Sequence, residues 1–156
     1  MQWTALPGGL RELDIAPEVD QALSHTVGAH GILRKRLARN VTLLRASDES
    51  VVLGFHAARV RIDHPDGTHM SIGGHKRDNG TDVFLTTRRL VIVFAGEYLE
   101  LQLAASGPVS PVHQGRFEAG DGAGSTVQFV FDLWAMHKTK IAALRDQIAL
   151  ACEVRT

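Results

Sequence analysis

The chain has 156 residues, of which 44% are hydrophobic and 22% are charged, an ordinary composition for one globular domain. Its 17 basic and 17 acidic side chains cancel, which argues against a nucleic-acid-binding protein built on a basic domain. Any function that depends on charge must therefore come from a local cluster.

Cysteine content and hydropathy indicate a compartment. The single cysteine, Cys152, cannot form a disulfide within the chain, and its apolar helical context is typical of a packing thiol. The first residues show no basic region followed by an apolar run, and no stretch approaches the ~18 apolar residues of a membrane span. We therefore expect a soluble, cytoplasmic protein without a cofactor.

Residues 1–50 are expected to form an arm and helices packed on the domain. Residues 1–16 are short apolar pieces around Pro7-Gly8-Gly9, which suits an extended arm or a partly ordered tail. Pro17, with acidic residues after it, favours a helix over residues 16–25 or beyond.

A basic amphipathic helix is predicted from Ile32 to Arg45. One helical stripe is apolar: Leu33, Leu37, Val41 and Leu44. The remaining arc is basic: Arg34, Lys35, Arg36, Arg39 and Arg45. This arc is either a solvated back face or a face for a membrane surface or an anionic partner.

The next strands are indicated by alternation and turn residues. Apolar positions switch from odd to even numbers within residues 51–63, which predicts a bulge or bend near Ala57. Pro65-Asp66-Gly67 predicts a hairpin that returns through residues 70–72. The densest strand signal lies at 82–103, where Thr87-Arg88-Arg89 separates two apolar runs and Ala95-Gly96 precedes an alternating segment. A three-stranded antiparallel meander is expected there.

The C-terminal part predicts a long loop, a strand and a helix. Residues 104–125 contain two prolines and five glycines, with a short edge strand expected within 113–119. Residues 126–131 read as the last strand, and Asp132 is placed to cap a helix. That helix should pack its apolar face against the sheet, through Trp134, Ile141, Leu144 and Ile148.

The run Phe84-Leu85-Thr86-Thr87-Arg88-Arg89-Leu90 resembles the hairpin of GRAM and bacterial PH-like domains, in which a strand ending in Leu-Thr is followed by a short turn, an Arg, a Leu and a second apolar strand. The resemblance covers residues 50–153 loosely, and the aromatic residue usual within the closing helix is displaced to Trp134. It implies an α+β fold: a PH-like curled antiparallel sheet or partly open barrel over residues 51–156, with N-terminal helices and a C-terminal helix.

Catalytic signatures are missing from the sequence: it contains no phosphate-binding loop, no Gly-x-Ser-x-Gly and no HExxH. We therefore expect a non-enzymatic module. His64 and His69 flank the Pro-Asp-Gly turn and, with His75 or Asp66, form a candidate metal site, although ordinary surface histidines explain them too. A pocket lined by several of His56, His64, His69 and Asp63 would favour a metal-dependent enzyme instead.

The family resemblance also implies a headgroup site. PH-like domains bind phosphoinositides through basic strand and loop residues, and the corresponding candidates here are Arg59, Arg61, Lys76, Arg77, Arg88 and Arg89. Scattered solvated charge and an acidic protein partner are the competing interpretations.

We predict an interaction module that binds a protein partner or self-associates, through an exposed strand or the Leu33-Leu37-Leu44 stripe. Binding of an anionic, phosphoinositide-type lipid at a membrane surface ranks second, because each surface Lys or Arg contributes only ~1 kcal/mol. A lipocalin-like small-molecule binder, with a deep apolar cavity, and a His-based metal-dependent enzyme are further alternatives. No nucleic-acid partner is expected.

Overall fold

The computed structural model describes residues 3–6, 31–44, 48–73, 81–101, 109–120, 124–134 and 136–154. The chain forms two compact units, each assembled from two segments. Unit 1 contains residues 1–56 and 82–100, and unit 2 contains residues 57–81 and 101–156. The N-terminal 50 residues thus group with the central hairpin, and each unit is described by itself below.

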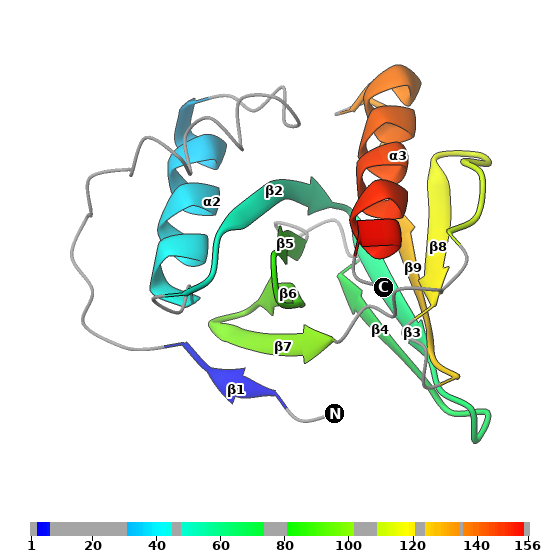
Figure 1. Cartoon of the computed structure of the whole chain (residues 1–156), viewed down its shortest axis with the longest axis horizontal. Coiled ribbons are helices and arrows are strands. Elements are labelled where there is room, and N and C mark those ends of the chain that lie inside the picture. The colour runs from blue at the N-terminus through cyan, green and yellow to red at the C-terminus, as the bar shows by residue number, and fades with distance from the viewer. Residues whose placement is uncertain are drawn as a thin grey trace. The chain divides into compact units, whose positions relative to one another are not determined.

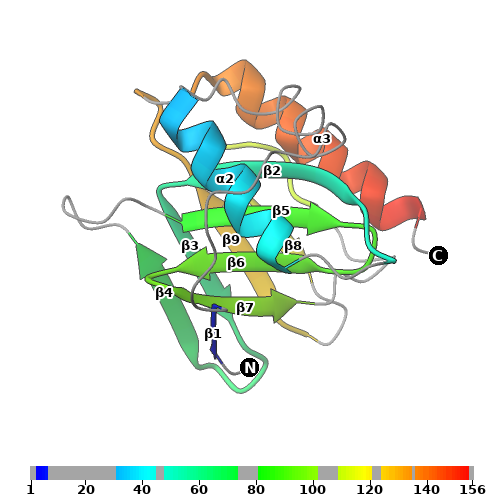
Figure 2. The ribbon, with the colours of Figure 1, turned by 90° about the vertical axis from the view of Figure 1, so that its left-hand side faces the viewer.

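Unit 1 is a five-stranded sheet with one described helix (Figures 1 and 2). The order of the strands is β1-β7-β6-β5-β2. The elements are β1 (Thr4–Ala5), α2 (Gly31–Leu44), β2 (Val51–Ala57), β5 (Thr81–Thr86), β6 (Leu90–Phe94) and β7 (Glu97–Leu101).

The predicted meander is confirmed as β5, β6 and β7. Leu85 pairs with Leu90, and the N–H of Thr86 donates to the carbonyl of Arg89 at 2.9 Å. Ala95 and Gly96 both have positive φ, 52° and 78°, as in the two-residue turns that suit the twist of a hairpin. Tight turns at the expected polar and small residues therefore set the register of this sheet.

The N-terminal arm adds the edge strand β1. Thr4 pairs with Tyr98 of β7, and the N–H of Leu6 donates to the carbonyl of Gly96 at 2.9 Å. The expectation of an arm lying on the domain is confirmed for residues 4–6. The helix predicted over residues 16–25 lies outside the described residues.

Helix α2 covers one face of the unit 1 sheet (Figure 2). The predicted apolar stripe is confirmed at Leu37 and Val41, which are both buried, and Arg39 is exposed on the helix as expected. Asn40 Nδ2 donates to Asp82 Oδ2 at 2.9 Å. The side chains of residues 31–36, among them Leu33, Arg34, Lys35 and Arg36, lie outside the description.

Unit 2 is a four-stranded antiparallel sheet with a long helix beside it (Figure 1). The order of the strands is β4-β3-β9-β8. The elements are β3 (Arg59–Asp63), β4 (His69–Gly73), β8 (Arg116–Gly120), β9 (Thr126–Val130) and α3 (Lys138–Val154). The described strands of the two units form two antiparallel sheets and no closed barrel, so the fold is β-rich α+β.

The predicted bend near Ala57 is confirmed and marks the passage between the sheets. β2 ends at Ala57, and β3 begins at Arg59. Gly73, paired with Arg59, has a φ of 82°, and a Cβ added to it would lie 2.6 Å from the carbonyl oxygen of Ala58. Only glycine therefore lets β4 approach the bend this closely.

The hairpin predicted at Pro65-Asp66-Gly67 joins β3 to β4. Asp66 Oδ1 accepts the N–H of Thr68 at 2.9 Å and its hydroxyl at 2.6 Å. The hydroxyl bond, with the backbone bond after it, lowers the pKa of Asp66 below its ordinary value because both stabilise the carboxylate. Gly67 takes the positive φ, 88°, that closes the turn.

Helix α3 confirms one half of the prediction for the closing helix and corrects the other. Ile141, Leu144 and Ile148 are buried as expected, and so is Cys152. Trp134, predicted to pack with them, is 99% exposed and precedes the helix. The prediction for Trp134 was wrong because the apolar spacing of α3 was extended backward across a turn.

The start of α3 also differs from the sequence prediction. Asp132 caps a turn rather than the helix, since its Oδ1 accepts the N–H of Trp134 at 3.0 Å and its carbonyl accepts the N–H of Met136 at 2.9 Å. The helix is capped by His137, whose Nδ1 accepts the N–H of Thr139 at 3.2 Å.

Replacing His137 by phenylalanine should remove this cap and lower the free energy of unfolding by about 1 kcal/mol. His137→Asp restores an acceptor and places a negative charge at the positive end of the helix dipole, so it should match or exceed the wild type. Urea denaturation followed by circular dichroism measures both. Equal stability of the two variants would refute the capping role of His137.

Candidate functional site

Three of the four predicted headgroup residues that the structure describes are in ion pairs. Arg61 Nε lies 3.1 Å from Asp63 Oδ1, and Arg88 Nη1 lies 2.9 Å from Asp48 Oδ1. The buried Nε of Arg59 has no hydrogen-bond partner among the described residues. Lys76 and Arg77 lie outside the described residues.

Arg89 is part of a buried network in unit 1. Its Nε and Nη2 lie 2.9 Å and 3.1 Å from the two carboxylate oxygens of Glu49, and it also bonds Glu100 and the carbonyl of Leu44. The hydroxyl of Thr86 donates to Glu49 Oε2 at 2.7 Å. The hydrogen bonds to Glu49 raise the pKa of Arg89 above its ordinary value. Two carboxylates already neutralise this guanidinium. Through its bond to the carbonyl of Leu44, Arg89 also holds the β5–β6 hairpin to the end of α2.

The predicted basic residues are also divided between the units. Arg59 and Arg61 belong to β3 in unit 2, whereas Arg88 and Arg89 lie in the β5–β6 turn of unit 1. Each unit taken alone therefore contains only part of the predicted set, and in each unit a described carboxylate already pairs with a member of it.

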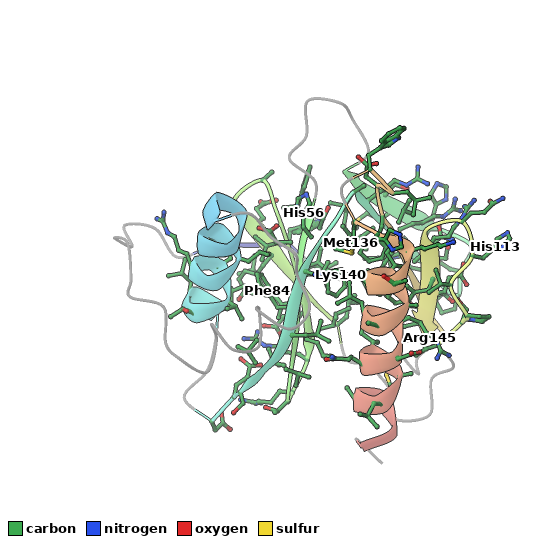
Figure 3. The ribbon with its side chains drawn as sticks, turned by 90° about the horizontal axis from the view of Figure 1, so that it is seen from above. His56, Phe84, His113, Met136, Lys140 and Arg145 are labelled. Carbon is green, nitrogen blue, oxygen red and sulfur yellow. The ribbon has the colours of Figure 1, made fainter. Side chains whose placement is uncertain are left out.

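His56 belongs to a polar cluster under α2. Its Nδ1 lies 3.0 Å from Asp82 Oδ1, and the other oxygen of Asp82 accepts the bond from Asn40. Asp82 is buried, and His56, labelled in Figure 3, is partly exposed. The three residues join α2, β2 and β5. Their hydrogen bonds also satisfy the buried carboxylate of Asp82, which would be costly to bury without partners.

The candidate metal ligands are not assembled in the described residues. His69 is paired with Asp63 across the hairpin, and not with His64. His64 Nδ1 lies 3.4 Å from Ser125 Oγ, and His75 lies outside the described residues. Among the residues that the structure describes, no three His, Cys, Asp or Glu side chains lie close enough to share a metal ion.

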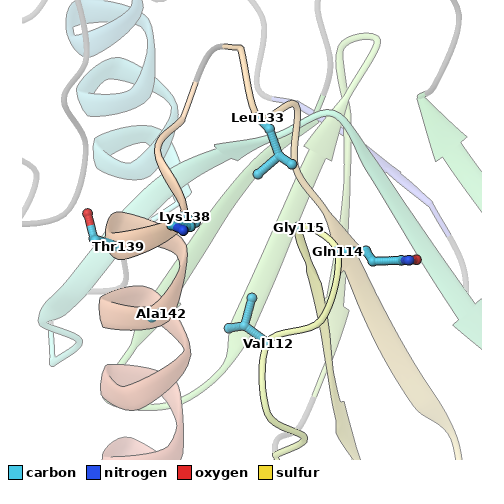
Figure 4. Close-up of a pocket in the computed structure, with 7 residues that line it drawn as sticks. All are labelled: Val112, Gln114, Gly115, Leu133, Lys138, Thr139 and Ala142. Carbon is cyan, nitrogen blue, oxygen red and sulfur yellow. The ribbon is translucent and has the colours of Figure 1, made fainter.

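An apolar groove lies in unit 2 where the loop before β8 meets the start of α3. It has a volume of about 440 Å³. Figure 4 shows Val112 and Leu133 pointing toward one another beside the first turn of the helix. The lining residues are Val112, Gln114, Gly115, Leu133, Lys138, Thr139 and Ala142.

The wall of the groove is fixed by a tight turn. Gln114 and Gly115 have φ of 50° and 73°, and His113 and Arg116 exchange backbone hydrogen bonds at 2.9 Å and 3.1 Å. The carbonyl of Gly115 accepts the N–H of Phe131 at 2.8 Å. A Cβ on Gly115 would lie 3.2 Å from Leu133 Cδ2, so glycine lets Leu133 lie against the turn.

Arg145 holds the segment that leads into this wall. Its Nη2 donates to the carbonyl of Val109 at 2.7 Å and its Nε to that of Ser110 at 2.9 Å, and Figure 3 shows Arg145 on α3. Hydrogen bonds from a charged donor are among the stronger ones in proteins. The groove is thus bounded by segments tied to one another before any ligand arrives.

The groove exposes a leucine and a cation, and an exposed tryptophan follows that leucine in the sequence. Leu133 is 54% exposed and Trp134 is 99% exposed. Lys138 lines the groove, and neither it nor Lys140 has an ion-pair partner among the described residues. No acidic residue is among those that line the groove. An occupant should therefore be apolar or aromatic, with groups that interact favourably with a cation.

Sequence reasoning missed this groove. Gly115 was a weak turn signal, since glycine readily takes the positive φ that a two-residue hairpin requires. Leu133 and Trp134 carried no such signal, because the sequence alone does not show whether an apolar residue is buried or exposed.

No protein-family model matches the chain, and no curated protein shows significant similarity to it. The resemblance to GRAM and bacterial PH-like domains stays a prediction. None of the helices in the described parts of the chain has the length and apolarity needed to cross a membrane.

Proposed function

We propose that this chain is a non-catalytic interaction module that binds a protein partner in the groove of unit 2. The observation that carries the proposal is an apolar groove that includes the exposed Leu133, with the exposed Trp134 as the next residue in the sequence. Tryptophan is enriched among the residues that dominate protein–protein binding energy. The PH-like assignment belongs to the same proposal, supported by two antiparallel sheets and a C-terminal helix.

The state of the basic residues favours a protein over lipid phosphate. Arg61, Arg88 and Arg89 are each within 3.1 Å of a carboxylate, so a phosphate would have to displace these partners. The groove requires no such exchange. Its apolar lining contributes to the free energy of binding through the burial of apolar surface, at about 25 cal/mol for each Å² buried.

A selection from a displayed random peptide library tests this function. The wild-type chain should enrich sequences that share an apolar or aromatic anchor, because the groove offers aliphatic walls. Ala142→Trp fills the groove and should lose this enrichment, whereas Ala143→Trp, at an exposed neighbouring position outside the lining, should keep it. Enrichment of the same peptides on all three proteins would contradict the proposal.

A further inference from the structure

Trp134 is exposed to solvent, and hydrogen bonds to Asp132 hold the backbone at this position. Its backbone N–H is held by Asp132 Oδ1 at 3.0 Å, and the carbonyl of Asp132 accepts the N–H of Met136 at 2.9 Å. Nearly the whole residue is exposed. A tryptophan can bury roughly 150–250 Å² on association, and a backbone fixed in advance reduces the conformational entropy lost on binding.

Trp134, which we call the anchor, directly follows a residue of the groove in the sequence. Leu133 lines the groove, and Trp134 is the next residue. A chain that carries both an exposed anchor and an apolar groove can form a two-fold symmetric pair, in which each copy offers what the other receives. We propose that the occupant of the groove is Trp134 of a second copy of this chain, in a reciprocal dimer.

The lining of the groove fits an indole ring. Val112, Leu133 and Ala142 supply aliphatic contacts. The ammonium group of Lys138 has no carboxylate partner among the described residues, and tryptophan offers the best aromatic face for a cation.

Charge and size set the strength of this dimer. The formal net charge of the chain is zero, so two copies do not repel each other at long range. One tryptophan and one leucine per copy bury less than the roughly 800 Å² per partner of a standard interface. The dimer is therefore weak and reversible, and its population depends on protein concentration.

Sedimentation velocity from about 1 µM to about 1 mM, a range suited to weak complexes, should show the mass rising from 17.0 kDa toward twice that value. In a Trp3→Phe background, the emission of Trp134 should shift to shorter wavelength over the same range. A wild-type chain that stays monomeric at the highest concentration overturns the inference.

Two variants test the contact without disturbing the core. Trp134→Ala should weaken the dimer roughly 30-fold, the effect of a hot-spot residue. Lys138→Glu should also weaken it, because a carboxylate repels the face of the indole, yet an acid in the first turn of a helix does not destabilise the helix. Lys140→Glu, an exposed change outside the lining, is the matched control and should dimerise normally.

A mixing experiment tests reciprocity. Trp134→Ala retains the groove, and Ala142→Trp retains the anchor, so each alone should be monomeric while their mixture forms a heterodimer with one of the two contacts. A Trp134→Ala variant that dimerises like the wild type overturns the inference. The inference rests on the proposed function of the groove, but the two fail separately: a monomeric chain that still selects peptides refutes only the dimer.

Discussion

Arg89→Met should lower the free energy of unfolding by about 3 to 5 kcal/mol, because it leaves the carboxylate of Glu49 buried without its counter-charge. The side chain of Glu49 is 1% exposed and that of Arg89 is 14% exposed, so water screens the pair poorly. Thr86 donates one hydrogen bond to Glu49, which replaces only part of what the guanidinium supplies. Chemical denaturation monitored by circular dichroism measures the loss.

Two controls separate the buried charge from other effects. Arg88→Met removes an exposed pair with Asp48 and should change stability by about 1 kcal/mol or less. The double variant Arg89→Met with Glu49→Met should recover much of the single-variant loss, since apolar residues of similar volume often replace a buried ion pair without penalty. A double variant as unstable as the sum of both singles would show that the carboxylate was not the cause.

Removal of residues 138–156 should abolish the cooperative unfolding of unit 2. Helix α3 buries Ile141, Leu144 and Ile148, which together are worth about 5 to 9 kcal/mol at about 1.5 to 3 kcal/mol each. That range is comparable with the whole stability of a domain. Differential scanning calorimetry of the shortened chain should show a reduced unfolding enthalpy, and an unchanged transition would refute the packing of α3.

Trp134→Ala is the informative companion to that truncation. The sequence pattern assigns Trp134 to the buried face of the helix, which would make its removal cost several kcal/mol. The structure leaves Trp134 exposed, so the melting temperature should stay within the range of ordinary surface substitutions.

Local signals in the sequence were reliable where the backbone depends on neighbouring residues. The hairpins at Pro65-Asp66-Gly67 and Thr87-Arg88-Arg89 form as predicted, since turn geometry is decided by a few consecutive residues. The bend near Ala57 was equally predictable, because the apolar positions change from odd to even numbers there, and this requires an interruption of the strand.

Features that depend on distant residues were not predictable from one sequence. Arg89 and Glu49 are 40 positions apart, and nothing local shows that the hairpin turn meets the end of α2. From the sequence alone the basic residues are therefore candidates for phosphate binding, because their carboxylate partners are identified only by the fold. The groove has the same origin, since Val112 and Ala142 converge only when the loop before β8 meets α3.

The way the chain passes between the units has a consequence for how the protein emerges from the ribosome. All segments of unit 1 are present once residue 100 has been made, whereas unit 2 still lacks residues 101–156. At that stage β3 and β4 form a two-stranded ribbon, which is marginally stable alone, and β3 exposes the edge that β9 later pairs with. An unpaired edge of this kind invites association with other chains. Unit 1 can thus fold during translation, whereas unit 2 can complete its sheet only after the final third of the chain has been made.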